Sequence, residues 1–318
     1  MKRIGITIGD VNGIGPEVAL KAICGDRRPA GVSFALVGPE ANWREQIERF
    51  GAELANRDVE ILPAGEPVAW RPGEICADAS RVALAAVDRA VDGCLSGAFD
   101  AMVTAPICKE GLHLAGIRVP GHTEYLAGRT GAERFGMMLV GGGLRVMLVT
   151  RHLPIAEVPP ALSEGNVLEA IELAAEALPA FGLAAGTIGV CGLNPHAGDG
   201  GVLGREEIEI IAPAIRAARE KGLRVSGPVP ADVVFHRALA GDFSAVVAMY
   251  HDQGLGPLKT IAFDEGVNVT LGLPVVRTSP DHGTAFGIAG KGIASARSME
   301  NAVALAAKMA GAPAEGER

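Results

Sequence analysis

Three histidines of this sequence occupy equivalent positions, each directly beyond a short apolar run. They are His152 in residues 149–154, His196 in residues 192–201 and His251 in residues 249–254. Imidazoles delivered from strand ends can form a three-ligand metal site with a position left open for substrate or water. Zinc suits imidazole ligands, and cobalt is a second candidate. Each histidine could instead be a hydrogen-bonded polar residue without a metal, and both interpretations stay open.

A second set of residues has the side chains that capture phosphate or carboxylate. The set is His122, Thr123, Lys259, Asn268 and Arg277. His122 and Thr123 open a predicted helix, whose free amides favour an anion. Lysine offers a point charge and arginine a two-pronged fork. Each basic residue could also be a solvated surface charge, although Arg277 follows an apolar run and is the least surface-like.

Two glycine-rich segments follow predicted strands, where ligands bind in open α/β sheets. In residues 9–17, Gly13 and Gly15 permit a tight turn and Pro16 suits the first position of a helix. The glycine spacing differs from the dinucleotide-binding G-x-G-x-x-G pattern, so a structural turn and an anion site remain equally open. Residues 281–294 contain four glycines and a histidine, and they are typical of a backbone that either wraps a flat ligand or forms a structural loop.

The elements that must position these residues alternate between short apolar runs and longer amphipathic ones. Strands are predicted at residues 3–8, 32–37, 101–105, 137–140, 145–150, 187–192 and 244–250. Helices are predicted at residues 16–24, 80–95, 166–180, 205–221, 231–240 and 299–310. The alternation indicates an α/β fold with mostly parallel sheets and helices on both faces.

Composition narrows the function classes. The chain has 318 residues, 48% of them hydrophobic, and a net charge of -8, which argues against a general nucleic-acid binder. The sequence contains neither a membrane-length apolar run nor a secretory leader, so a cytoplasmic location is expected. The five cysteines are scattered, and we expect reduced thiols. Cys108, in a loop flanked by glycine and proline, is either a small buried side chain or a reactive thiol.

Together these motifs resemble the 4-hydroxythreonine-4-phosphate dehydrogenase family of vitamin B6 biosynthesis, which includes 4-phosphoerythronate and threonate dehydrogenases. The resemblance runs along nearly the whole chain, and its most specific segments are Asn-Pro-His-Ala-Gly at 194–198 and His-Asp-Gln-Gly at 251–254. It implies NAD(P)-dependent oxidation of 4-phosphooxy-L-threonine to a 3-keto acid that decarboxylates, in a homodimer whose active site the neighbouring subunit completes.

The resemblance also implies residue roles. His152, His196 and His251 would bind zinc, magnesium or cobalt, and the anion-binding set would hold the phosphorylated substrate. Lys259 is the candidate general base, with a metal-bound water as the alternative. A likeness to isocitrate and isopropylmalate dehydrogenases, which concerns the two glycine-rich segments, implies that the second segment holds the NAD or NADP cofactor. Its cofactor-binding residues would be His282, Gly283, Ala285, Gly290 and Gly292.

Those dehydrogenases also imply two domains, residues 1–115 with 278–318 and residues 116–277, with the active site in the cleft between them. Val11-Asn12 and Asp199 depart from the family's common Pro-Ala and Glu, which leaves the subgroup open. Gly287 stands where relatives carry an acidic ribose ligand, so NAD and NADP both remain candidates. Rival functions are a dehydrogenase for phosphoerythronate, phosphothreonate or an aromatic cis-dihydrodiol, and a metal-dependent hydrolase or transferase.

Overall fold

The computed structural model describes residues 1–50, 54, 59–119 and 121–311, and the chain divides into two compact units. Unit 1 comprises Met1–Glu133 and Leu273–Arg318, and unit 2 comprises Arg134–Gly272. The boundaries therefore differ from those expected at 115/116 and 277/278. The helix that begins at His122 packs within unit 1, and Arg277 opens a strand of its sheet. That the active site lies between the domains stays a prediction.

Unit 1 is built on a parallel sheet with the strand order β3-β2-β1-β4-β11. Its strands are β1 (Lys2–Thr7), β2 (Val32–Val37), β3 (Val59–Leu62), β4 (Ala101–Thr104) and β11 (Arg277–Pro280). Its helices are α1 (Gly15–Cys24), α2 (Glu40–Phe50), α3 (Ala77–Leu95), α4 (Lys109–Leu114), α5 (His122–Thr130) and α11 (Arg297–Met309).

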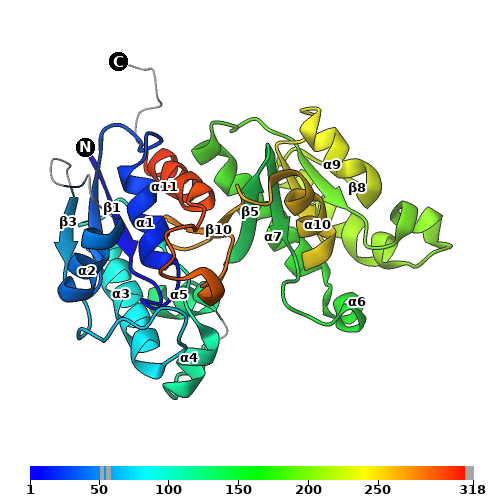
Figure 1. Cartoon of the computed structure of the whole chain (residues 1–318). Helices are drawn as coiled ribbons and strands as arrows, with labels where there is room; N and C mark the ends of the chain where they lie inside the picture. Colours follow the sequence, from blue (N-terminus) through cyan, green and yellow to red (C-terminus); the bar gives the residue numbers. More distant parts are fainter. Residues whose placement is uncertain (51–53, 55–58, 120, 312–318) are drawn as a thin grey trace. The chain divides into compact units, whose positions relative to one another are not determined.

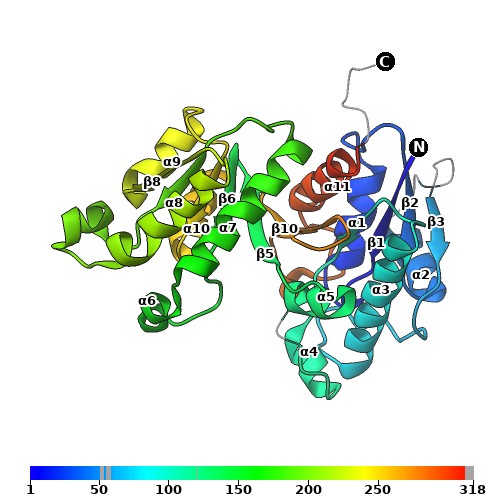
Figure 2. The ribbon, with the colours of Figure 1, turned by 180° about the vertical axis from the view of Figure 1, so that it is seen from behind.

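Helices cover both faces of this sheet. α1 packs against α2 and α11, whereas α3 contacts β1, β2 and β4 from the opposite face, as Figures 1 and 2 show. Because both faces are covered, the central strands are mostly apolar, and Ile4 and Ile6 of β1 are fully buried.

Unit 2 contains a mixed sheet with the order β10-β5-β6-β9-β7-β8. Its strands are β5 (Gly136–Gly141), β6 (Leu144–Leu148), β7 (Ile188–Cys191), β8 (Val225–Val229), β9 (Ala245–Ala248) and β10 (Val267–Leu271). Only the pairs of β5 with β6 and β10 are antiparallel among those described. The helices are α6 (Val158–Ala161), α7 (Glu164–Ala177), α8 (Ala212–Glu220), α9 (Ala231–Leu239) and α10 (His251–Ala262).

The predicted α/β class, with mostly parallel strands and helices on both faces, is confirmed. The strands and helices predicted from periodicity all occur, with ends shifted by a few residues. Four strands and four α-helices of the described chain were not predicted: β3, β8, β10, β11, α2, α4, α6 and α10.

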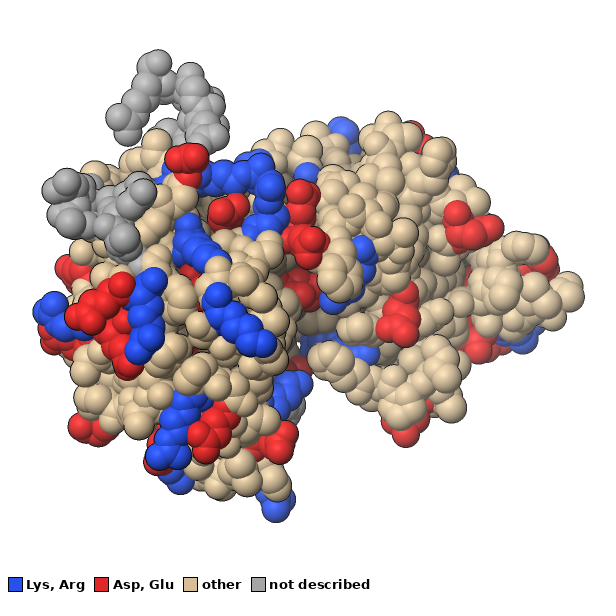
Figure 3. Space-filling model, viewed as in Figure 1, with Lys and Arg blue, Asp and Glu red and all other residues tan. Residues whose placement is uncertain are grey.

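The surface agrees with the modest net charge of the chain. Basic and acidic side chains are interspersed on the face drawn in Figure 3. No helix in the described part of the chain is both long and apolar enough to span a membrane.

Candidate active site

His152 and His251 lie close together because they follow neighbouring parallel strands. Leu148 of β6 pairs with Ala248 of β9, so the carboxyl ends of both strands reach the same edge of the sheet. Beyond the strands, the Thr150 amide and hydroxyl donate to the Met249 carbonyl at 3.1 and 2.8 Å. These hydrogen bonds tie the segment that carries His152 to the segment that carries His251.

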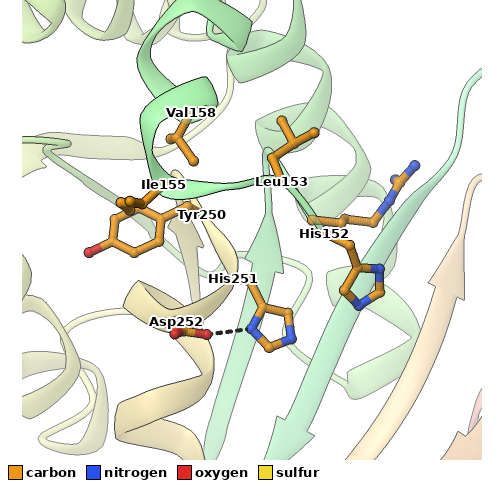
Figure 4. A pocket seen from close by; sticks show the side chains of 8 residues that line it. His152, Leu153, Ile155, Val158, Tyr250, His251 and Asp252 are labelled. Atoms are coloured by element: carbon orange, nitrogen blue, oxygen red, sulfur yellow. Dashed lines mark hydrogen bonds and ion pairs between the residues drawn. The ribbon is translucent and has the colours of Figure 1, made fainter.

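The two imidazole rings face a common cavity. Their centroids are 5.5 Å apart and their planes make an angle of 41°. The cavity measures about 270 Å³, and Figure 4 shows Tyr250, Ile155 and Val158 along its apolar side. His251, directly beyond the β9 strand, is the first residue of α10 and not a loop residue. A ring at a helix start is held more rigidly than one in a loop.

Two of the predicted metal ligands have a carboxylate on Nδ1. His251 Nδ1 lies 2.7 Å from Asp252 Oδ1, drawn dashed in Figure 4, and His196 Nδ1 lies 3.2 Å from Asp199 Oδ2. A carboxylate on one ring nitrogen orients the imidazole and leaves Nε2 with a lone pair for a cation. The donor chemistry at His152, His196 and His251 therefore suits a divalent metal.

The structure does not bring His196 to the other two histidines. In the part of the chain that the structure describes, no group of three or more His, Cys, Asp or Glu side chains is gathered as metal ligands would be. His196 lies in the turn Pro195–Gly201, where the backbone of residues 196–201 is left-handed throughout. That the three histidines share one cation therefore stays a prediction.

The anion-binding residues His122, Thr123 and Arg277 gather in unit 1. His122 and Thr123 begin α5, and Arg277 begins β11 with only 2% of its surface exposed. The Arg277 Nε and Nη2 groups donate to the Thr104 hydroxyl at 3.0 and 2.7 Å. One imidazole nitrogen of His122, Nε2, is buried and has no hydrogen-bond partner in the described structure. Such an orphaned polar atom beside a guanidinium suits an anionic ligand.

The electrostatics of this group reflect burial and crowded positive charge. Burial lowers the pKa of Arg277 to about 9, partly offset by the Glu124 carboxylate. Burial, followed by the fields of Arg277 and Lys109, lowers the pKa of His122 well below its usual value. The Arg277 guanidinium and the His122 imidazole are both shielded from water, so an anion bound beside them would meet side chains that are already desolvated. Lys109, at the start of α4, was not singled out from the sequence because only the fold brings it near His122.

The other two predicted substrate ligands belong to unit 2. Lys259 is in α10, eight residues after His251, which corresponds to about 12 Å along a helix axis. Its Nζ lies 6.0 Å from the centre of the Phe263 ring. Asn268 is in β10, where it pairs with Leu139 of β5. The structure places neither residue along the cavity of His152 and His251.

The two glycine-rich segments pack against each other within unit 1. The Ile14 amide donates to the Thr284 carbonyl at 2.9 Å, and a Cβ on Gly13 would lie 2.8 Å from the same oxygen. An ion pair on α1, between buried Glu17 and half-buried Lys21, holds the end of the second segment. Lys21 Nζ donates to the carbonyls of Gly292 and Ala294, and to Glu17, which accepts from the Ala294 amide.

Features of the second segment suit a closely wrapped ligand. Ala285, Gly290 and Gly292 all have a left-handed backbone, and Gly283 faces open space. Nε2 of His282 is buried without a partner among the described residues, whereas its Nδ1 lies 3.0 Å from the Gly283 carbonyl oxygen. This orphaned nitrogen is compatible with the predicted cofactor role, which stays a prediction.

Asn12 of the first glycine-rich segment has a structural role. Its side chain is fully buried; Nδ2 donates to the Glu74 carbonyl and Oδ1 accepts from the Arg71 amide. Its own carbonyl accepts from the Gly73 amide. Asn12 therefore fixes residues 71–74 beside the first glycine-rich segment. Cys108 is the N-cap of α4, accepting from the Gly111 amide, and burial raises its pKa, which disfavours a reactive thiolate.

Asp10 gives the first glycine-rich segment a measurable pH dependence. Its carboxyl group accepts from the Asn12 amide and the Ser80 hydroxyl, but burial raises its pKa to about 6. Ionised Asp10 therefore destabilises the fold, since the protonated form is favoured up to pH 6. We expect Asp10→Asn to raise the free energy of unfolding by up to about 3 kcal/mol at pH 8. The gain should shrink as pH falls through 6 and vanish near pH 4.

Denaturant unfolding between pH 4 and 8 checks this expectation. Asp26→Asn is the control, since Asp26 is exposed. A pH-independent difference between Asp10→Asn and the parent protein would contradict the assignment of the raised pKa to Asp10.

Comparison with known proteins identifies the family. The profile of the family described as "Pyridoxal phosphate biosynthetic protein PdxA" matches residues 19–306. The chain belongs to this family. A 4-hydroxythreonine-4-phosphate dehydrogenase of Aromatoleum aromaticum is 47% identical over 312 residues, covering 96% of each chain. A D-threonate 4-phosphate dehydrogenase of Cupriavidus necator is 44% identical over 326 residues, covering 96% of this chain and 97% of that one.

Solved structures give the same result for this PdxA-family chain. The crystal structure of 4-hydroxythreonine-4-phosphate dehydrogenase from Klebsiella pneumoniae superposes with a TM-score of 0.86 at 39% identity, covering 98% of this chain and all of that one. A beta-decarboxylating dehydrogenase from Thermococcus kodakarensis, at 16% identity and a TM-score of 0.53, shares the fold. The chain is thus an oxidoreductase of the dehydrogenase type, as the motifs suggested.

Proposed function

We propose that this PdxA-family protein oxidises 4-phosphooxy-L-threonine with NAD or NADP, in pyridoxal phosphate biosynthesis. The product, 2-amino-3-oxo-4-phosphooxybutanoate, loses carbon dioxide to give 3-amino-2-oxopropyl phosphate. The observation that carries the proposal is the buried Arg277 guanidinium beside His122 and Lys109, in a chain 47% identical to a 4-hydroxythreonine-4-phosphate dehydrogenase. Such a group suits a dianionic phosphate.

Arg277 would hold the substrate phosphate through its guanidinium, which Thr104 already orients from one side. His122 Nε2 and the Thr123 hydroxyl would complete that contact at the start of α5, with the Lys109 ammonium supplying further positive charge. Lys259 and Asn268 are proposed to bind other parts of the substrate. Fixing the reacting carbon in this way supplies several kcal/mol through positioning alone.

His152, His251 and His196 would hold a divalent cation, zinc, magnesium or cobalt. When bound, this cation supplies a Lewis acid that lowers the pKa of the substrate hydroxyl. Asp252 and Asp199 keep the proton of His251 and His196 on Nδ1. Lys259 is the proposed acceptor of the hydroxyl proton. His282, Gly283, Ala285, Gly290 and Gly292 are proposed to hold the NAD or NADP to which the substrate's hydride passes.

By analogy with the family, we also propose a cytoplasmic homodimer in which the neighbouring subunit completes each active site. This arrangement would explain why one chain gathers two of the three histidines but not the third. The hydrolase or transferase alternative disagrees with the dehydrogenase names of the relatives.

A second candidate substrate is a 4-phosphorylated threonate or erythronate, since the D-threonate 4-phosphate dehydrogenase is 44% identical to this chain. The candidates share the phosphate and differ beside the reacting carbon, so Arg277 and His122 suit both. We expect kcat/KM for 4-phosphooxy-L-threonine to exceed that for D-threonate 4-phosphate at least tenfold. Cofactor reduction, followed with NAD and NADP in parallel, checks this, and the reverse preference would contradict the proposed substrate.

A further inference from the structure

The turn that carries His196 has a backbone that its residues do not favour by themselves. His196, Ala197 and Asp199 have φ values of 53°, 54° and 43°, and Gly198, Gly200 and Gly201 continue the left-handed run. Each non-glycine residue in this region costs about 1–2 kcal/mol. The conformation persists only if surrounding groups hold it.

A single buried carboxylate holds the residues that lead into this turn. Glu207 is 3% exposed and begins the π-helix Glu207–Ile211, which leads into α8. Its Oε1 accepts from the Leu193 and Asn194 amides at 2.8 and 2.7 Å. Its Oε2 accepts from the Asn194 side-chain amide at 3.0 Å. All three donors lie directly before the left-handed turn.

Close packing fixes the turn against the same carboxylate. A Cβ on Gly198 would lie 2.7 Å from Glu207 Oε2, and a Cβ on Gly192 would lie 2.8 Å from the Ala197 Cα. The turn can therefore approach Glu207 only because these two positions are glycine.

The segment that leads into the turn is also tied to the helix that carries His251. The buried Gln253 side chain donates from Nε2 to the Gly192 carbonyl at 2.7 Å and accepts the Met249 amide at 2.7 Å. Glu207 acts beyond this point, on Leu193 and Asn194. The backbone that leads into His196 is thus held at Gly192, Leu193 and Asn194 by groups that leave the imidazole exposed.

We propose that Glu207 is a positioning residue that holds His196 in the orientation needed for metal binding, although Glu207 itself is no ligand. The inference rests on the proposed metal role of His196. The groups around a metal ligand typically change metal affinity 10- to 100-fold when they are replaced. A glutamine at this position keeps the size but brings an NH₂ group where an acceptor is required. Asn194 cannot turn its amide over to compensate, because its Nδ2 also donates to Glu206 Oε2 at 2.7 Å.

Cobalt(II) titration of the metal-free full-length protein, followed by the absorption spectrum of the bound metal, tests the proposal. We expect Glu207→Gln to weaken cobalt binding at least 10-fold, with a melting temperature within a few degrees of the parent protein. Glu209→Gln is the matched control, because Glu209 lies in the same π-helix and its exposed side chain pairs with the exposed Arg205. We expect that control to bind cobalt as the parent protein does.

The variant His196→Ala distinguishes a failure of the metal role of His196 from a failure of the positioning role of Glu207. If His196→Ala binds cobalt like the parent protein, the metal role of His196 is wrong and the inference falls with it. If His196→Ala is impaired but Glu207→Gln is not, only the positioning role of Glu207 is overturned.

A second variant, Gly198→Ala, tests the proposal if Glu207→Gln does not fold. Gly198→Ala pushes the turn away from Glu207 from the other side while keeping the carboxylate. We expect the same loss of cobalt affinity, with faster hydrogen exchange confined to residues 192–204. Parental cobalt affinity in folded Gly198→Ala would contradict the proposal.

Discussion

Replacing Arg277 with methionine is expected to lower kcat/KM for the phosphorylated substrate by about 100-fold without loss of stability. A hydrogen bond from a charged group contributes about 1.5–3 kcal/mol, and 1.4 kcal/mol is tenfold. Stability should hold or rise, because burial lowers the pKa of Arg277 to about 9 and so disfavours the charged form in the fold. Steady-state kinetics and thermal unfolding of the same preparation measure both effects.

The controls for this variant separate phosphate binding from general damage. Arg145→Met removes another partly buried guanidinium, which donates to the Gly143 and Ser244 carbonyls and lies in no proposed site. We expect its kinetics to match those of the parent protein. Arg277→Met should also lose its discrimination between the phosphorylated substrate and the unphosphorylated analogue. If that discrimination survives, Arg277 does not bind the phosphate.

Removing divalent metal with a chelator is expected to abolish oxidation of the substrate, and zinc, cobalt or magnesium should restore it in part. His152→Ala and His251→Ala should each lower kcat by roughly three orders of magnitude, since a Lewis acid supplies several kcal/mol of stabilisation to the reacting oxygen. Both variants should bind the phosphorylated substrate nearly as well as the parent protein, because Arg277 and His122 are untouched.

The matched controls for the histidine variants are His113→Ala and His236→Ala. Both residues are exposed and belong to no proposed site. Turnover that persists at full rate in demonstrably metal-free protein would rule out the metal role. Equal losses in the two control variants would show that the effect is not specific to His152 and His251.

Much of the fold was predictable because its central strands are apolar and its long helices are amphipathic. β11 escaped prediction because its sequence, Arg-Thr-Ser-Pro, is polar, although all four residues are buried. α10 escaped because Gly254, Gly256 and Pro257 are poor helix formers, and only its packing on β5, β6 and β9 explains the helix. Periodicity cannot reveal elements that tertiary contacts stabilise.

The candidate site, like the fold, was predictable only in part. The proximity of His152 and His251 follows from β6 and β9 being parallel neighbours, a pairing that the sequence suggests only as one of several strand orders. The left-handed turn at His196 was not predictable, because histidine, alanine and aspartate disfavour that backbone and the carboxylate that supports it, Glu207, lies eleven residues further along the chain. Lys109 was missed for a similar reason, since α4 and α5 approach only in the fold.

The central claim is that His152 and His251 bind a catalytic cation. Anomalous diffraction at the zinc edge, on crystals of the active zinc-loaded enzyme, tests it most directly. The account predicts a peak about 2.0–2.1 Å from a ring nitrogen of both His152 and His251. An active, zinc-loaded crystal whose only anomalous peaks lie away from these two imidazoles would contradict it.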